Sequence, residues 1–222
     1  MYNRCMEIIR LNEVDSTQIF LKNYILEFGY KTPICVVTDL QKAGIGSRGN
    51  SWIGNKGNLF FSFVLSKDLL PKDLPIQSAS IYFTYILKNI LQKNGSNVWI
   101  KWPNDFYIGN VKIGGTITTL SKDLLYCGIG INLVEVSENY GVLDIKIDQD
   151  FILFEYFKEV EKIISWKQIF SLFKIEFQKS RNYKTTVDGQ KISLENAILN
   201  DDGSIHIENK KVFSLRWQRL FQ

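Results

Sequence analysis

The spacing of hydrophobic positions changes several times along this chain, and each spacing predicts a different element of secondary structure. Short apolar runs predict strands at 7–14, 34–38, 59–66, 98–101, 106–108, 111–120 and 124–133. Apolar residues three to four positions apart predict a helix of about three turns that begins at Ser16 and Thr17, a second helix over 76–93 and two more within 150–179. The aromatic residues of the last helix, from Trp166 to Phe177, share one face and are expected in the core. Helices and strands interleaved in this way indicate an α/β domain.

The pattern changes again after Ser180, where short strands are separated by Asp188-Gly189 and Asp202-Gly203. These dipeptides are typical of tight turns, so the C-terminal segment is expected to form a small β barrel. We therefore predict two domains, an α/β domain from 1 to about 180 and a small β domain from about 181 to 222.

Composition narrows the class of protein. Hydrophobic residues make up 45% of the 222 positions and charged residues 23%, which is typical of a globular chain and excludes a disordered or collagen-like one. The three cysteines are far apart, so neither a disulfide framework nor a zinc knuckle is predicted. The first 13 residues lack the apolar stretch of a secretory signal, and the longest apolar run, 59–65, is far shorter than the roughly 20 residues that span a bilayer. We therefore expect a soluble, cytoplasmic protein with no membrane partner, and its net charge of +4 favours acidic or phosphate-bearing partners.

The dipeptide at 109–110, Gly-Asn, predicts a two-residue turn and a β-hairpin with a chemically distinct face. In the simplest register, Tyr107 lies opposite Lys112 and Asp105 lies opposite Gly114. Strand side chains alternate between faces, so these four residues share one face, and the other face is wholly apolar. The hairpin is expected to present a carboxylate beside an ammonium group, with a glycine between them that leaves room for a flat ligand. An exposed hairpin with a simple cross-strand ion pair is the alternative.

Glycines are concentrated in two places. Gly114 and Gly115 adjoin within a predicted strand, where glycine is unfavourable unless there is a bulge or another backbone or a ligand comes close. The segment 40–58 holds five glycines and few aliphatic residues, so we expect a long loop there. Its backbone N–H groups and Arg48 suit a phosphate, although the G-x-x-x-x-G-K-[ST] string of a P-loop is absent.

Four blocks of this sequence, taken together, resemble the biotin–protein ligase family in its short type, which lacks an N-terminal DNA-binding domain. The blocks are Asp15-Ser16-Thr17, QKAGIGSRGNSW at 41–52, KWPNDFYIGNVKIGG at 101–115 and GIGINL at 128–133. The KWPND string followed by a lysine site is the most specific of them, and the resemblance covers essentially the whole chain. It implies a fold of the α/β (α+β) class, with a mixed sheet flanked by helices and a small C-terminal SH3-like β domain.

The resemblance implies two half-reactions. Biotin and ATP, with Mg²⁺ on the triphosphate, give biotinyl-5′-adenylate and pyrophosphate, and the adenylate then acylates a lysine of a biotin carboxyl carrier protein. The implied biotin contacts come from Ser16, Thr17, Gln41, Gly44, Lys112, Gly115 and Gly128. The implied nucleotide contacts come from Arg48, Trp52, Asn104, Asp105, Lys112 and Asn132. No direct metal ligand is predicted.

The chemistry needs a cation, because a carboxylate must approach the polyanionic triphosphate in line with the α-phosphorus. We expect Lys112 to supply that charge, with Lys101 and Arg48 assisting. Asp105 is expected to orient Lys112 or the nucleotide, and helping the carrier lysine lose its proton is the second role open to it.

The glycine loop departs from the family pattern G-R-G-R-x-G. In this chain residues 44–49 are Gly-Ile-Gly-Ser-Arg-Gly, so two arginines are missing and Arg48 alone remains. In the family these arginines help to hold the adenylate, and a hydrogen bond to a charged group is worth roughly 1.5–3 kcal/mol. We therefore expect weaker retention of the adenylate than is typical of the family.

Other interpretations are weaker or remain open. His206, the only histidine, is expected at the surface of the β domain, and Cys35 and Cys127 are expected as buried thiols. A lipoate–protein ligase is disfavoured because the R-R-x-x-G-G-G loop of that group is absent, whereas a biotin sensor without catalysis stays open. About 14 residues precede the Asp15 block, too few for a helix-turn-helix, so we expect no DNA binding. A monomer and a homodimer are both compatible with the sequence.

Overall fold

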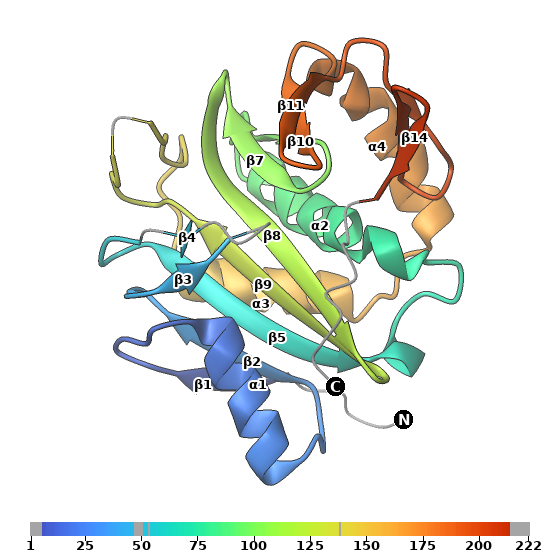
Figure 1. The fold of residues 1–222 in the computed structure, drawn as a ribbon. Helices are drawn as coiled ribbons and strands as arrows, with labels where there is room; N and C mark the ends of the chain where they lie inside the picture. The colour runs from blue at the N-terminus through green and yellow to red at the C-terminus, as the bar shows by residue number, and fades with distance from the viewer. Residues whose placement is uncertain (1–5, 47–50, 53, 138, 214–222) are drawn as a thin grey trace.

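A seven-stranded sheet runs through the middle of the molecule (Figure 1). The computed structural model describes residues 6–46, 51–52, 54–137 and 139–213. In spatial order the strands are β1 (Glu7–Arg10), β2 (Ile34–Thr38), β5 (Leu59–Ser66), β9 (Leu124–Ile131), β8 (Val111–Ser121), β7 (Asp105–Ile108) and β6 (Trp99–Lys101). β1 and β2 are parallel and every other neighbouring pair is antiparallel, so the sheet is mixed, as the resemblance implied.

Helices cover the two faces of this sheet unequally. Against one face lie α2 (Ala79–Lys93), which follows the short helices η2 (Lys67–Leu69) and η3 (Ile76–Ser78), and α3 (Gln149–Val160), while α4 (Trp166–Ser180) packs beside α2 and β6. On the opposite face, α1 (Thr17–Phe28) packs over β2, β5 and β9. Within the described residues no helix covers β8 on the α1 face, and this part of the sheet is where a ligand can reach the strands.

The hydrophobic core lies between the sheet and the helices α2, α3 and α4. The ring of Phe63 meets the rings of Phe83 and Phe157 edge to face, at centroid distances of 5.0 and 5.5 Å. Phe173 and Phe177 of α4 are 0% and 1% exposed, which confirms the expected aromatic face of that helix. Edge-to-face packing of this kind stabilises a core beyond the burial of area alone.

Most predicted elements are present, and the first helix shows why. Ser16 is the N-cap of α1, with extended backbone, and its Oγ accepts a hydrogen bond from the backbone N–H of Ile19 at 3.4 Å. A cap of this type satisfies one of the unpaired N–H groups at a helix start, so Ser-Thr before the apolar spacing was a reliable signal. Strand β5 has the predicted bounds.

Two segments differ from the expectation. Within the predicted loop 40–58, β3 (Gly44–Ile45) and β4 (Ser51–Trp52) form a short antiparallel pair. Strands of two residues are too short to leave a period in the hydrophobic pattern. The first strand, predicted over 7–14, ends at Arg10, and Val14 forms an isolated bridge to Gln41 instead.

After α4 the chain forms two small antiparallel sheets, as expected from its turn dipeptides. The first pairs β10 (Lys184–Val187) with β11 (Gln190–Ser193), and the second contains β12 (Ile198–Leu199), β13 (Ile205–Ile207) and β14 (Lys210–Val212). Val187, Leu194 and Ile205 belong to the same hydrophobic cluster as the sheet and its helices. The division into two domains near residue 180 stays a prediction. No helix in the described part of the chain is long and apolar enough to cross a membrane.

Candidate active site

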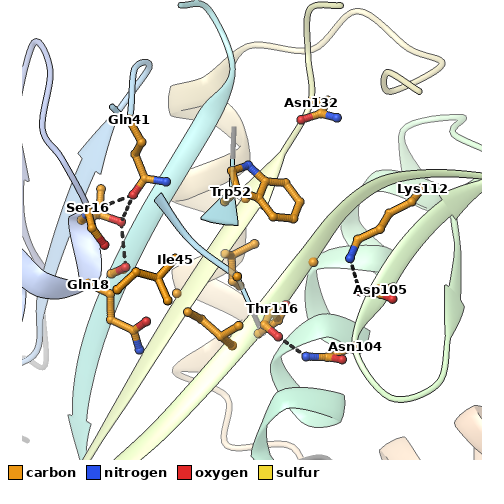
Figure 2. Close-up of a pocket in the computed structure, with 18 of the residues that line it drawn as sticks. Ser16, Gln18, Gln41, Ile45, Trp52, Asn104, Asp105, Lys112, Thr116 and Asn132 are labelled. Carbon is orange, nitrogen blue, oxygen red and sulfur yellow. Dashed lines mark hydrogen bonds and ion pairs between the residues drawn. The ribbon is translucent and has the colours of Figure 1, made fainter. Parts of the chain in front are cut away.

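A cleft of about 400 Å³ lies on the α1 face of the sheet, where α1 leaves β8 and the neighbouring parts of β5 and β9 uncovered (Figure 2). It brings together ten of the predicted site residues from five separate parts of the sequence. These are Ser16, Thr17, Gln41, Trp52, Asn104, Asp105, Lys112, Gly115, Gly128 and Asn132. Residues that are distant in the sequence thus meet in one cavity.

One end of the cleft is a network of neutral polar side chains. The backbone N–H and the hydroxyl of Thr17 both donate to Oε1 of Gln41, at 2.8 and 3.0 Å. The Thr17 hydroxyl also shares a hydrogen bond of 2.8 Å with the hydroxyl of Ser62 on β5. Because the carbonyl oxygen of Gln41 is held from one side, its NH₂ group is turned away from Thr17 and can donate to a ligand (Figure 2).

Gly44 shapes this end of the cleft without lining it. A Cβ atom at this position would come within 2.8 Å of Nε2 of Gln41 and 2.7 Å of the carbonyl oxygen of Trp52. Any larger residue would therefore displace the Gln41 amide or separate β3 from β4. Gly44 is not among the residues that line the cleft, so its predicted contact with biotin stays a prediction.

The other end of the cleft is charged. Nζ of Lys112 on β8 lies 2.6 Å from Oδ1 of Asp105 on β7, and both side chains are partly buried, at 25% and 21% exposed. Nζ of Lys101 lies 3.9 Å from Oδ2 of the same carboxylate and 5.5 Å from the ring centre of Tyr107. Lys101 does not line the cleft, so of the three predicted catalytic residues Lys112 and Asp105 reach the cavity and Lys101 lies behind Asp105.

The hairpin register differs from the prediction by one residue at its open end. Tyr107 pairs with Lys112 as predicted, but Asp105 pairs with Gly115 and not with Gly114, because a bulge shifts the register between Phe106 and Tyr107. A bulge inserts an extra residue into one strand, which sequence spacing alone does not reveal. Gly115 is therefore the glycine between the two charges.

The packing of the two glycines agrees with this corrected register. A Cβ at Gly115 would lie 3.3 Å from Oδ1 of Asp105 and 3.7 Å from Cε of Lys112. A Cβ at Gly114 would instead collide with the carbonyl oxygen of Gly130 at 2.5 Å. Gly115 thus keeps the site open, whereas Gly114 allows close packing of β8 against β9.

Glycines also form the floor between the two ends. On β9, a Cβ at Gly128 would lie 3.1 Å from Oγ of Ser62, and a Cβ at Gly130 would lie 3.1 Å from the ring of Trp52. The Trp52 ring in turn has Nζ of Lys112 at 5.5 Å from its centre. The floor is flat because side chains are missing there, so a planar ligand can lie on the strands.

Several buried polar atoms of the lining have no hydrogen-bond partner among the described residues. They are Nε2 of Gln18, Nε1 of Trp52, Oγ1 of Thr116 and Oδ1 of Asn132. Buried donors and acceptors are nearly always paired in folded proteins, so these atoms indicate a site that is completed by a ligand or by water. Together they offer both donors and acceptors, which suits a heterocycle that also carries both.

The two asparagines are held by the backbone around the charged end. Asn104 Nδ2 donates to the carbonyl of Thr116, and the N–H of Thr116 donates to the carbonyl of Asn104 at 2.9 Å. Asn132 Nδ2 donates to the carbonyl of Gly141 at 3.1 Å. Both side chains are almost fully buried, so their positions are set by the fold before any ligand binds.

Sequence reasoning missed other residues that line the cleft. They are Gln18, Ile45, Gly46, Ser62, Thr116, Ile117, Ile129, Gly130 and Tyr140. Gly130 lies inside the GIGINL block and could have been chosen with Gly128, because residues two positions apart in a strand share the same face. Ser62 lies in an otherwise apolar strand, and a buried hydroxyl there was a signal for a polar site. Arg48 lies outside the described residues, so its expected contact with phosphate stays a prediction.

The residues expected to have no role in chemistry are placed as predicted. Cys35 and Cys127 are fully buried, and burial raises the pKa of both thiols, so neither is a thiolate nucleophile at neutral pH. His206 is exposed and its Nδ1 contacts Asn200.

Comparison with known proteins places the chain in a family. Residues 11–132, which contain every predicted site residue, match the biotin/lipoate A/B protein ligase family. The chain belongs to this family, as the four sequence blocks indicated.

Individual relatives point to a narrower group than the family model does. The structure of a biotin acetyl coenzyme A carboxylase synthetase from Helicobacter pylori, described with bound biotinylated ATP, superposes with a TM-score of 0.89 at 38% identity over 94% of this chain and 100% of that chain. A biotin protein ligase from Aquifex aeolicus, in complex with biotin and ATP, gives 0.71 at 25% identity over 95% and 98% of the two chains. Biotin–protein ligase 2 of Arabidopsis thaliana is 36% identical over 108 residues, which cover 45% of this chain and 32% of the relative, so the chain spans about a third of that curated protein.

Proposed function

We propose that this chain is a biotin–protein ligase that activates biotin with ATP and transfers it to a lysine of a biotin carboxyl carrier protein. The observation that carries the proposal is one continuous cleft with neutral donors and acceptors around Gln41 at one end, the Lys112–Asp105 pair at the other and a glycine floor between them. The similarity to the Helicobacter pylori synthetase, over the whole of that chain, supports the same assignment.

The neutral end suits the head group of biotin. A ureido ring carries two N–H donors and one carbonyl acceptor, and the site offers the hydroxyls of Ser16 and Thr17 and the amide of Gln41. The flat ring would lie on Gly115 and Gly128, with Gly44 keeping the Gln41 amide in place. The acid chain of biotin would then extend along the floor toward Lys112.

The charged end suits the reacting anions. In the first half-reaction a carboxylate oxygen of biotin attacks the α-phosphorus of ATP, the bond to the β-phosphate oxygen breaks, and pyrophosphate leaves with that electron pair. The ammonium group of Lys112 would bind the carboxylate and the α-phosphate together, which holds two anions in line and lowers their repulsion. Asp105, with Lys101 behind it, would fix the position of Lys112.

The nucleotide would occupy the side of the cleft formed by Trp52, Asn104 and Asn132, with Arg48 as a further predicted contact. An indole ring is suited to stacking on adenine, and the unpaired acceptor of Asn132 can receive an N–H or O–H. Mg²⁺ would enter as the complex with ATP and would neutralise the triphosphate. Triphosphate oxygens and water would be its main ligands, and the described residues contain no group of three His, Cys, Asp or Glu side chains that could hold a metal ion.

In the second half-reaction the amine of the carrier lysine attacks the acyl carbon of the adenylate. A C–N bond forms, the mixed anhydride C–O bond breaks, AMP leaves, and the ammonium proton is lost to a base or to water. Asp105 is the carboxylate among the described residues of the cleft lining, so receiving or relaying that proton is a second role open to it besides positioning Lys112.

The direct test measures transfer of labelled biotin to a purified carrier domain in the presence of ATP and Mg²⁺, with lipoate offered as a rival acid. Transfer of biotin and not of lipoate supports the proposal, and the reverse selectivity makes the protein a lipoate ligase. Biotin binding without pyrophosphate release leaves a sensor as the function and overturns the ligase.

We further propose that the chain acts in the cytoplasm and binds neither DNA nor membrane, with the carrier protein as its macromolecular partner. A gel-shift assay with mixed DNA fragments tests the first absence and vesicle co-sedimentation tests the second. Sedimentation velocity with and without biotin and ATP decides between a monomer and a homodimer.

A further inference from the structure

The strand that leads into the active site is at the edge of the sheet, and its outer side is bound by a helix. β6 pairs with β7 on one side. On its other side, the N–H of Ile100 donates to Oε1 of Glu176 at 3.0 Å and the N–H of Trp102 donates to Oγ of Ser180 at 2.9 Å. Both acceptors are on α4 and are buried, at 8% and 0% exposed.

The spacing of these two acceptors matches the strand. Glu176 and Ser180 are one helical turn apart, which is about 6 Å along α4. Ile100 lies in β6 and Trp102 directly follows the strand, and two residues of extended chain span about 6.6 Å. The helix α4 therefore lies where an eighth strand would pair, and two of its side chains accept the N–H hydrogen bonds that backbone carbonyls of such a strand would accept.

Glu176 is itself held by a second buried residue. Its Oε2 lies 2.8 Å from Nζ of Lys88 on α2, and the two side chains are 8% and 7% exposed. The ring centre of Tyr85 lies 4.4 Å from the same ammonium group. Buried ion pairs of this kind add little stability, because the cost of removing both charges from water offsets their attraction. Holding Oε1 toward Ile100 is a geometric role that does not depend on net stabilisation.

β6 leads into the turn at 102–104, which connects Lys101 to Asp105 and is called the catalytic turn below. Lys101 and Asp105 are paired residues of β6 and β7, and Asp105 contacts Lys112. A shift of β6 along its own axis would move Asp105 relative to Lys112. Reactions of this type lose rate steeply when a reacting group moves, with about a hundredfold lost for 1 Å.

We propose that Glu176 and Ser180 are positioning residues for the adenylation step, which set the catalytic turn by fixing the register of β6. This inference rests on the proposed function, and it predicts that the hydrogen-bond acceptor at position 176 matters while its charge does not.

Two double variants separate the acceptor from the charge. Lys88→Gln with Glu176→Gln removes both charges and keeps an acceptor for Ile100, whereas Lys88→Met with Glu176→Met removes the charges and the acceptor. We expect the methionine pair to lower kcat for pyrophosphate release about 10- to 100-fold, by the steep dependence of rate on position, with the KM for biotin changed less than about twofold. The glutamine pair should keep kcat close to that of the unmodified chain.

A second pair of variants tests the other acceptor. Ser180→Ala should lower kcat in the same way, and Ser171→Ala is the matched control, because the Ser171 hydroxyl donates within α4 to the carbonyl of Gln168 at 2.8 Å. Amide hydrogen exchange measured on the same proteins should be faster at Ile100 in the methionine pair and at Trp102 in Ser180→Ala. This readout does not depend on activity.

The outcomes distinguish this inference from the proposed function. If the unmodified chain releases no pyrophosphate with biotin and ATP, the proposed function fails and this role fails with it. If the unmodified chain is active and the folded methionine pair has the same kcat, the positioning role alone is wrong. Equal losses in the glutamine and methionine pairs would also overturn it, because the charge and not the acceptor would then be required.

Discussion

Thr17 donates two hydrogen bonds to a single atom of Gln41. Its backbone N–H and its hydroxyl lie 2.8 and 3.0 Å from Oε1, in a part of the cleft where Gln41 is 9% exposed. One residue at the start of α1 therefore decides which end of the Gln41 amide faces the ligand. The NH₂ group is the end that remains for recognition.

Replacing Gln41 by Glu should weaken biotin binding about tenfold or more. The variant keeps the size of the side chain and the acceptor for Thr17, but it loses the donor, and an unsatisfied buried partner costs about 1–3 kcal/mol. Isothermal titration with biotin measures the change in Kd. Gln190→Glu, on the exposed surface of β11, is the matched control and should bind biotin normally. An unchanged Kd for Gln41→Glu would show that this amide does not contact biotin.

Lys112→Met should abolish most of the adenylation rate and leave more of the binding. Removing one preorganised group that stabilises developing charge typically costs about 100- to 1,000-fold in kcat. Pyrophosphate release under saturating biotin and ATP measures the first half-reaction alone. Lys191→Met, which removes an exposed lysine of β11, should retain full activity. A Lys112→Met variant with normal kcat would remove this residue from the mechanism.

The bulge in the hairpin predicts opposite outcomes for two adjacent glycines. Gly115→Ala adds a methyl group 3.3 Å from Oδ1 of Asp105, within the site, so the protein should unfold at nearly the normal temperature and lose activity. Gly114→Ala places a methyl group 2.5 Å from the carbonyl oxygen of Gly130, within the sheet, so it should lower Tm. Thermal unfolding and pyrophosphate release are measured on both variants. A lower Tm for Gly115→Ala together with lost activity for Gly114→Ala would support the register without a bulge.

The same hairpin shows how far the sequence could predict this site. The ten predicted residues of the cleft were found because each block carries an unusual local signal, such as hydroxyls at a helix start or glycines within a strand. Their pairing at the turn, Tyr107 with Lys112, followed from a two-residue loop. The pairing at the open end did not follow, because a bulge depends on the packing of Ile113 and Gly114 against the rest of the sheet.

The residues that hold the site in place could not be predicted from the sequence, because their partners are distant in the chain. Glu176 follows the pattern of a polar residue beside the aromatic face of α4, and its burial against Lys88 appears only when α2 and α4 meet. Ser62 in a run of apolar residues is similar, because its partner Thr17 is 45 positions away. The spacing of hydrophobic residues within one helix or strand shows which face of that element is buried. It does not show which distant side chains the element contacts.

Asp73 is expected to make stability depend on pH. Its carboxylate accepts hydrogen bonds of 3.0 Å from the N–H groups of both Trp166 and Lys167, the first two residues of α4. Burial acts to raise the pKa of Asp73, but these backbone hydrogen bonds outweigh it and the pKa is lowered. Because the folded-state pKa lies below the unfolded value, the stabilisation is present above the unfolded pKa and is lost as the pH falls through the folded one.

The corresponding variant is Asp73→Asn, which removes the charge at the helix N-terminus. Urea unfolding at pH 7 should show a loss of about 1 kcal/mol, typical of a carboxylate at a helix start. The difference between the two proteins should shrink as the pH falls below about 4, the usual pKa of an aspartate in an unfolded chain. Asp123→Asn, at an exposed ion pair with Lys67, should change stability little at any pH. A difference that stays constant down to pH 2 would assign the effect to something other than the charge.

Ile45→Arg should slow the escape of the acyl-adenylate. Ile45 lines the cleft and is 43% exposed, at a position where the resemblance to the family implies an arginine. A guanidinium group there could donate to the phosphate, and a charged hydrogen bond of roughly 1.5–3 kcal/mol corresponds to a release rate about 10- to 100-fold lower. Release of preformed biotinyl-5′-adenylate, chased with unlabelled biotin and ATP, measures this rate directly. Ile45→Met has the length without the charge and should release the intermediate as fast as the unmodified chain. Equal rates for the Arg and Met variants would contradict the expectation that the missing arginine at position 45 weakens retention of the adenylate.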